Sequence, residues 1–329
     1  VTDAVVKTKC GACHASDDRG NLQILSWTRT TPEGWQDALK RMILSENLMV
    51  TPVEARSIVR YLSDRHGLAP EEMQPVTYDV ERRSHEETNI PNDVIGKSCA
   101  RCHTFAKPMS WRRSPEEWKR YLAAHAKRYN YPPLEDAAAY LGKAAPLHSP
   151  EWQAWSARTT SANLSGRWLV TATIAGKGKF IGEMQLEPLV ADGVASADEF
   201  NTRTVMRSVR DGAVVARTGR IAVYAGYAWR GRSKGVSEIA APDDPAAETR
   251  EVVWFSPDQT RANGRWFWGQ YQEFGYDVTL QRPSSGPSVL AVDKPSLKVG
   301  SAANRIRLLG DAFPAQVKAE DIQLGAGVK

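Results

Sequence analysis

The sequence lacks any apolar run close to the roughly 20 residues that a membrane-spanning helix requires. It opens with "VTDAVVK", which has neither the basic nor the apolar region of a signal peptide, so we expect a mature, soluble chain. It also lacks a basic tail or stripe, and its formal net charge is only +5, so the charge pattern typical of nucleic-acid-binding proteins is missing.

Cysteine and histidine are scarce and unevenly placed. The chain has four cysteines and six histidines, and neither residue type occurs beyond His148. A metal site in the second half would therefore need oxygen ligands alone. Four cysteines in two tight pairs are compatible with disulfides, zinc or haem, and the residue that follows each pair distinguishes between these.

All four cysteines fall in two C-x-x-C-H pentads, "CGACH" and "CARCH". Two thiols one short turn apart can add to the two vinyl groups of a porphyrin, and the adjacent histidine can bind the iron. Neither a zinc ribbon nor a thioredoxin-like site requires that histidine. The pattern predicts two covalent c-type haems and, because such haems are normally attached outside the bacterial inner membrane, a periplasmic protein. The attachment residues are Cys10, Cys13 and His14, and Cys99, Cys102 and His103.

The pentads head two similar segments, "TPEGWQDALKRMILSENLM" and "SPEEWKRYLAAHAKRY". Each begins with an N-cap residue and a proline, and each is expected to form an amphipathic helix that a further helix follows. With Trp35 and Trp118 aligned, Met42 falls opposite His125, each seven residues after its tryptophan. The repeat predicts two helical cytochrome c lobes, about 1–80 and 81–155, in a dihaem domain that ends near residue 155.

Methionine and histidine are the usual sixth ligands of low-spin haem c. The aligned positions therefore predict His14 with Met42 at the first iron and His103 with His125 at the second. Methionine is the weaker donor to ferric iron, so the first haem should have the higher potential. With both sixth positions filled, neither iron is open to a substrate, and we expect electron transfer with no catalytic residue in this chain.

Other residues could fill the sixth positions. Met49 is the alternative to Met42, and His148 is the alternative to His125; Met42 and His125 could also be packing and surface residues. His66 and His85 are expected to be solvent-exposed residues of loops or helix ends.

The second half changes to a period of two, which is typical of strands. Seven or eight strands separated by "AGKG", "RDG" and "RANG" predict an antiparallel β-barrel over residues 166–283. An immunoglobulin-like β domain is expected over residues 286–329, incomplete because a sandwich needs about 100 residues. The fold class is therefore multidomain α and β. In the first strand, the larger apolar positions Trp168, Val170, Ala172 and Ile174 alternate with polar or smaller residues.

This order of domains resembles the α subunit of quinohemoprotein amine dehydrogenase. The resemblance is carried by the two pentads, the segments from Trp35 to Met42 and from Trp118 to His125, and the barrel opening "SGRWLVTATIAGKGKFIGEMQLEP". It implies a periplasmic heterotrimer that oxidises primary amines to aldehydes and ammonia. A small partner subunit would carry cysteine tryptophylquinone, and a β-propeller subunit would help to enclose it. This chain would pass electrons through its haems to a soluble acceptor such as azurin or a small cytochrome c.

Two other functions remain open at this level. A dihaem cytochrome c peroxidase would be mostly helical and would need one iron open to peroxide, and the barrel argues against it. A free-standing dihaem electron carrier with a ligand-binding barrel would purify alone, whereas a dehydrogenase subunit would purify with two further chains.

The pentads generate the first testable prediction. Denatured protein should retain two covalently bound haems, and Cys10→Ala and Cys99→Ala should each impair the attachment of one, because each removes a thioether bond. Haem counting by absorbance after denaturation checks this. Full haem content in a protein that still has a reactive thiol pair would contradict it.

Overall fold

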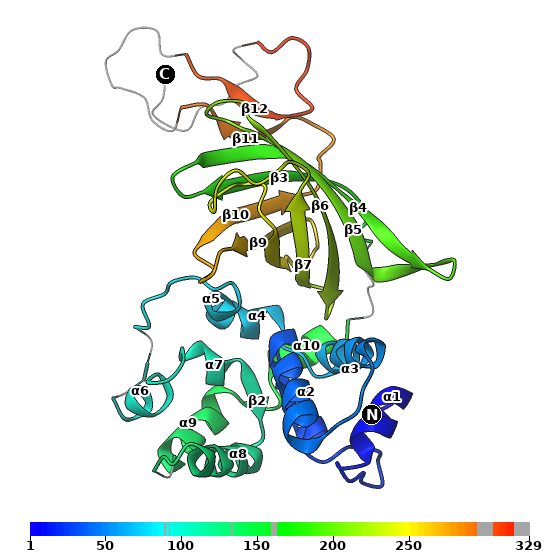
Figure 1. The fold of residues 1–329 in the computed structure, drawn as a ribbon, viewed down its shortest axis with the longest axis vertical. Helices are drawn as coiled ribbons and strands as arrows, with labels where there is room; N and C mark the ends of the chain where they lie inside the picture. The colour runs from blue at the N-terminus through cyan, green and yellow to red at the C-terminus, as the bar shows by residue number, and fades with distance from the viewer. Residues whose placement is uncertain (89, 92, 133, 159–162, 295–304, 319–329) are drawn as a thin grey trace. The chain divides into compact units, whose positions relative to one another are not determined.

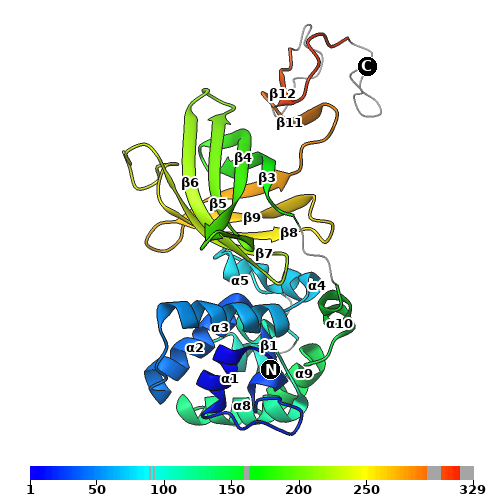
Figure 2. The ribbon, with the colours of Figure 1, turned by 90° about the vertical axis from the view of Figure 1, so that its right-hand side faces the viewer.

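The computed structural model describes residues 1–88, 90–91, 93–132, 134–158, 163–294 and 305–318 (Figures 1 and 2). The chain divides into two compact units. The first holds the described helices, the strands β1 and β2, and the segment Tyr224–Tyr227, and the second holds the other strands.

The helical unit alternates helices with two very short strands. None of the described helices is both long and apolar enough to cross a bilayer. The elements are α1 (Ala4–Gly11), η1 (Leu25–Trp27), β1 (Thr28–Thr30), α2 (Pro32–Glu46), α3 (Pro52–Arg65), α4 (Pro70–Met73), η2 (Gln74–Val76), α5 (Thr77–Val80), α6 (Asp93–Cys99), α7 (Ala106–Met109), β2 (Trp111–Arg113), α8 (Pro115–Arg128), α9 (Glu135–Ala144) and α10 (Pro150–Ser156).

The two helices that follow the pentads begin as the sequence predicts. The Thr31 hydroxyl accepts the amide of Gly34 (3.1 Å) at the start of α2, and the Ser114 hydroxyl accepts the amide of Glu117 (3.2 Å) at the start of α8. A proline occupies the first turn of each helix, where its missing N–H leaves no bond unmade. These caps fix where both helices start.

The internal repeat is also visible in the packing of its two tryptophans. Trp35 Nε1 donates to the carbonyl of His66 (2.9 Å), and Trp118 Nε1 donates to the carbonyl of Ala145 (3.1 Å). Each of these carbonyls also accepts a backbone amide from the strand region that precedes its tryptophan helix. The two lobes are therefore assembled in the same way.

The strands β1 and β2 join the lobes as a two-stranded antiparallel sheet. Arg29 lies opposite Arg112 in this ladder. The alignment of Trp35 with Trp118 also makes Arg29 the repeat counterpart of Arg112. When a residue of one repeat pairs with the equivalent residue of the other, a local two-fold axis passes between them. The two lobes are therefore related by a two-fold axis at the ladder.

One buried carboxylate binds both of these arginines. Arg29 makes two hydrogen bonds to Glu72, each of 2.8 Å, Arg112 Nε makes a third of 3.0 Å, and the Ser149 hydroxyl donates a fourth of 2.8 Å. Burial alone would raise the pKa of Glu72, but the bonds and charges of the two arginines outweigh it and lower the pKa to about 2. Glu72 is therefore ionised at neutral pH.

The second unit is built on a closed antiparallel barrel of eight strands in the order β10-β3-β4-β5-β6-β7-β8-β9. The predicted barrel is confirmed, and Trp168, Val170, Ala172 and Ile174 are all buried. The strands are β3 (Gly166–Ile174), β4 (Gly178–Ala191), β5 (Val194–Ser208), β6 (Val214–Tyr224), β7 (Ala228–Gly235), β8 (Thr249–Phe255), β9 (Arg261–Trp268) and β10 (Phe274–Gln281).

Two strands follow the barrel, β11 (Ser288–Val292) and β12 (Leu308–Asp311), and they pair antiparallel. An immunoglobulin-like sandwich is not confirmed. Residues 295–304 and 319–329 of the expected domain lie outside the described residues.

The Glu72 site generates a stability prediction. Its pKa in the folded protein, about 2, is below its ordinary value of 4.5, so its stabilisation is present above pH 4.5 and is lost as the pH falls towards 2. Glu72→Gln should lower the free energy of unfolding at pH 7 by about 3–5 kcal/mol, because it leaves two buried arginines without their carboxylate. It should also weaken the loss of stability at acidic pH.

Denaturant unfolding between pH 7 and pH 2 measures both effects. Glu71→Gln is the matched control, because Glu71 is the exposed neighbour in the same helix. Equal unfolding free energies for the two variants at pH 7 would show that the buried carboxylate does not stabilise the fold.

Candidate functional site

Each pentad lies at the end of a helix, the first at the end of α1 and the second at the end of α6. Cys10 and Cys99 are buried, 9% and 7% exposed, whereas Cys13 and Cys102 are exposed. In the first pentad the amides of Cys13 and His14 both bond to the carbonyl of Cys10, at 3.1 and 2.9 Å. This closes the tight turn that places two thiols and an imidazole together.

The cysteines form neither disulfides nor one shared site. All four lie in the described part of the chain and are free thiols. Cys10 belongs to the hydrophobic cluster of the first lobe and Cys99 to that of the second. Burial raises the pKa of Cys10 to about 11 and also raises the pKa of Cys99, so both thiols are protonated at neutral pH. The pentads therefore form two separate sites.

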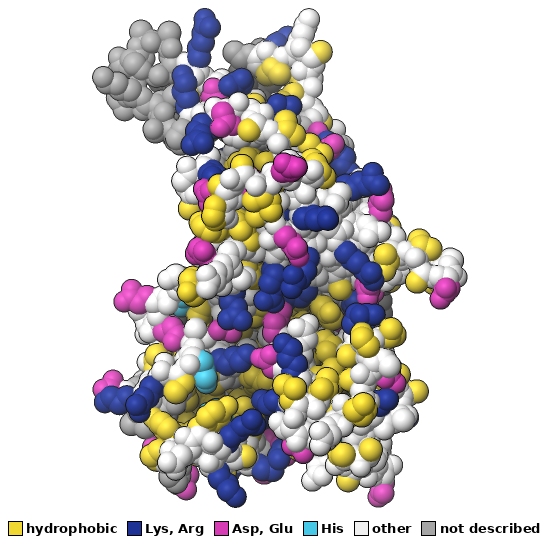
Figure 3. All heavy atoms as spheres, in the orientation of Figure 1, with side chains coloured by type: hydrophobic (Ala, Val, Ile, Leu, Met, Phe, Trp, Pro, Cys, Tyr) yellow, Lys and Arg dark blue, Asp and Glu magenta, His cyan; other side chains and the backbone are white. Residues whose placement is uncertain are grey.

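A pocket in the second lobe brings together Cys99, His103 and His125. In Figure 3 the surface over α7, α8 and α9 shows hydrophobic side chains with lysine and arginine side chains beside them and a histidine at the surface. The predicted proximal and sixth ligands of the second iron thus line one pocket. The other lining residues are Asp37, Arg41, Lys107, Pro108, Trp111, Trp118, Tyr121, Leu122 and Leu134.

Both histidines of this pocket can offer an unprotonated ring nitrogen. His103 Nδ1 lies 2.9 Å from the carbonyl oxygen of Thr104, which can only accept, so Nδ1 carries a proton and Nε2 is the ring nitrogen left to bind a metal. Burial lowers the pKa of His125, and the charges of His103, Arg128 and Arg41 lower it further. A neutral imidazole is the form that binds iron.

The first site is described by fewer contacts. His14 is half-buried, and burial lowers its pKa, with a further contribution from the charge of Arg120. Met42 is half-buried on α2, whereas the Met49 side chain is 81% exposed. The Met49 carbonyl accepts Lys9 Nζ (3.0 Å), so its loop lies against α1. Met42 is thus the more enclosed of the two methionines, and the choice between them stays a prediction.

Helix α2 turns opposite faces to the two sites. Trp35 and Leu39 are buried in the cluster that contains the first pentad's cysteine. Asp37 and Arg41, which lie roughly half a turn away around the helix, line the pocket of the second site. Ala38, between the two faces, packs against both hydrophobic clusters. This helix is a wall that both sites share.

The sequence analysis missed the residues that reach the second pocket from elsewhere. Asp37 and Arg41 come from the first lobe, and Trp111 comes from β2, where its ring meets the edge of Trp35 at 6.4 Å. No motif marks these positions. The one available signal was the spacing of Asp37 and Arg41, which puts two charges on one side of a helix, opposite its apolar face.

The remaining histidines lie outside the pocket. His148 is exposed and does not line it, in contrast to His125. The prediction that His66 lies at the surface was wrong: it is half-buried, its ring packs against Trp35 at 6.4 Å, and burial lowers its pKa to about 4. No local pattern links His66 to the tryptophan that shields it, because Trp35 on α2 lies 31 residues earlier in the sequence.

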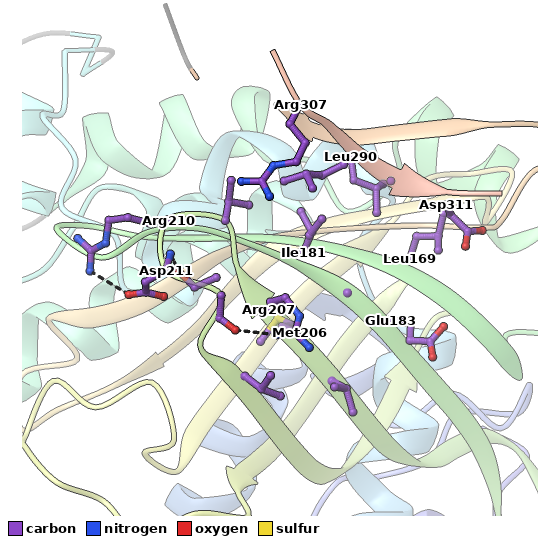
Figure 4. Close-up of a pocket in the computed structure, with 18 of the residues that line it drawn as sticks. Leu169, Ile181, Glu183, Met206, Arg207, Arg210, Asp211, Leu290, Arg307 and Asp311 are labelled. Atoms are coloured by element: carbon purple, nitrogen blue, oxygen red, sulfur yellow. Dashed lines mark hydrogen bonds and ion pairs between the residues drawn. The ribbon is translucent and has the colours of Figure 1, made fainter. Parts of the chain in front are cut away.

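A larger pocket lies in the barrel unit, between β3, β4 and β5 on one side and β11 and β12 on the other (Figure 4). Arg167 on its wall pairs with Glu183 and Asp311, and Arg210 pairs with Asp211. Its lining residues include neither cysteine nor histidine, so it offers no thiol or imidazole for haem.

The second pocket fits a c-type haem. It supplies a buried thiol, two imidazoles, an aromatic and aliphatic wall, and cations that can meet propionate carboxylates. The first site supplies a buried thiol and an imidazole held by a closed turn, with two candidate methionines.

Comparisons with known proteins agree with this chemistry. The model of quinohemoprotein amine dehydrogenase A, alpha subunit, haem binding, matches residues 1–141, and that of quinohemoprotein amine dehydrogenase, alpha subunit domain II, matches residues 161–283. No curated protein matches the chain.

Among solved structures, a redesigned β-barrel is 15% identical over 38% of this chain and 95% of its own length, with a TM-score of 0.29. A de novo designed fluorescence-activating β-barrel is 17% identical over 36% of this chain and 93% of its own length, with a TM-score of 0.27.

The two family models together span most of the sequence. The chain therefore belongs to the family of quinohemoprotein amine dehydrogenase α subunits, whose first domain binds haem.

Proposed function

We propose that this chain is the electron-transfer subunit of a periplasmic quinohemoprotein amine dehydrogenase and carries two covalent c-type haems. Electrons would come from a cysteine tryptophylquinone on a small partner subunit, within a heterotrimer that also has a β-propeller subunit. They would leave to a soluble acceptor such as azurin or a small cytochrome c. The overall reaction is the oxidative deamination of primary amines.

The observation that carries this proposal is the pocket that holds Cys99, His103 and His125 together. A thiol and two imidazoles that converge within an apolar wall suit an iron with both axial positions filled. The first pentad repeats the buried cysteine, the exposed cysteine and the adjacent histidine, which supports a second site of the same kind.

The residues of the chain would hold and insulate the haems. When bound, each haem would exchange one electron at a time between the ferric and ferrous states. His103 is oriented by its bond to the Thr104 carbonyl, and the buried side chains of Trp118 and Leu122 form an apolar part of the pocket wall. With a histidine on each side of the second iron, no position would remain for a substrate, so the chemistry on the amine belongs to the partner subunit.

The two sites would differ in their sixth ligand, His125 in the second and Met42 in the first, with Met49 as the alternative to Met42. Imidazole stabilises ferric iron more than a thioether does. The second haem would therefore have the lower potential, and unequal potentials would favour transfer in one direction.

The ligand assignment at the second iron is tested by His125→Met. The change should raise the midpoint potential of that haem by on the order of 0.1 V, within the roughly 0.8 V that axial ligands span, because a thioether stabilises ferric iron less. A redox titration followed by visible spectroscopy measures it. His148→Met is the matched control and should leave both potentials unchanged; a shift in the control alone would move the ligand to His148.

The assignment of amine oxidation to a partner subunit, and of electron transfer to this chain, is tested with the chain separated from its partners. Dithionite should reduce its haems, whereas a primary amine should not, because the quinone is on another subunit. Adding the partner subunits should restore amine-dependent reduction, followed by stopped-flow absorbance. Amine-dependent reduction by the lone chain would contradict the assignment.

A further inference from the structure

The pocket of the second site contains one acid and two cations besides its histidines. Asp37 and Lys107 form an ion pair across the pocket, with Lys107 Nζ 2.8 Å from Asp37 Oδ2. Their charges therefore largely cancel. Arg41, the other cation, has no carboxylate partner among the residues that the structure describes.

Arg41 is held at this pocket by an aromatic ring and not by an ion pair. Its guanidinium lies over the Trp111 ring, 5.9 Å from the ring centre, and Trp111 itself lines the pocket. The side chain is half-buried, and its charge is close enough to lower the pKa of His125. A cation stacked on an aromatic face keeps its N–H groups available for an anion at the ring edge.

The first site offers a contrast. The cation that acts on His14 is Arg120, on α8, and it forms an ion pair with Glu117 one turn before it on the same helix. An arginine that already binds one carboxylate has fewer N–H groups and less uncompensated charge available for a second carboxylate. The unpaired cation is therefore a feature of the second site.

Haem brings two propionate carboxylates to any site that binds it. A carboxylate at a half-buried site needs a cation or several hydrogen bonds, since burying it alone is costly. We propose that Arg41 binds a propionate of the second haem and raises the midpoint potential of that haem. Helix α2 of the first lobe thereby completes the binding site of the second lobe, and the assignment rests on the proposed haem at His103.

The sign of the effect follows from charge. Reduction of the iron adds an electron, and a nearby positive charge stabilises the reduced state. Arg41→Gln should therefore lower the midpoint potential of the second haem. At a fixed electrode potential we expect the ratio of reduced to oxidised second haem to fall by about three- to tenfold, where tenfold corresponds to about 59 mV for one electron.

The experiment is a spectroelectrochemical titration of the complete, haem-loaded protein. Lys40→Gln is the matched control: it removes the same charge one residue away on α2, but Lys40 is exposed and does not line the pocket. It should change the ratio by less than twofold. Arg41→Lys keeps the charge without the planar fork and should give an intermediate shift.

The outcomes separate this inference from the proposed function. Haem content is counted first in the parent protein, and the absence of haem at the second pentad would refute the proposed function before any titration. With haem present, equal potentials of the second haem in the parent protein and in Arg41→Gln would overturn the role of Arg41. Equal shifts in Arg41→Gln and Lys40→Gln would also overturn it, because the effect would then be general surface charge. Loss of the second haem in Arg41→Gln with retention in Arg41→Lys would support it.

Discussion

The carboxylate of Glu72, bound between Arg29 and Arg112, is the interaction on which the helical unit depends. Each arginine is the central residue of its short strand, and Glu72 comes from α4, near the end of the first lobe in sequence. The N–H groups left over donate to carbonyl oxygens, Arg29 to Leu147 and Gly67 and Arg112 to Met109. The lobes are joined by directional bonds, which fix a geometry that apolar contact alone would leave adjustable.

That geometry determines what reaches the second site. A shift of one residue between β1 and β2 would move the first lobe by about 3.3 Å along the strand and would turn its side chains to the other face of the ladder. Asp37 and Arg41 reach the pocket of the second lobe only in the observed register, because α2 begins directly after β1. The second site is marked in the sequence by one pentad and the helix after it, but its pocket is lined by residues of both lobes.

Much of the fold could be read from the sequence because its signals are local. The N-cap and proline before each tryptophan helix and the alternation that begins at Trp168 depend on neighbours within a few residues, and both were confirmed. The half-buried position of His66 and the approach of Arg41 to the second pocket depend on contacts between distant segments. Residue spacing does not identify the distant partner in such contacts: the spacing of Asp37 and Arg41 places two charges on one side of α2 but does not show that they reach the second pocket.

The two-fold relation at the ladder cannot extend to the whole helical unit, because two arginines meet at the axis. A residue on a two-fold axis meets its own copy, so this axis brings two like charges together. A single carboxylate can bind both arginines, but a symmetric copy of it would compete for the same space. Glu72 is supplied once, by one segment. A repeated fold that pairs arginine with arginine at its axis must therefore break its symmetry at the centre, and its two lobes need not have the same chemistry.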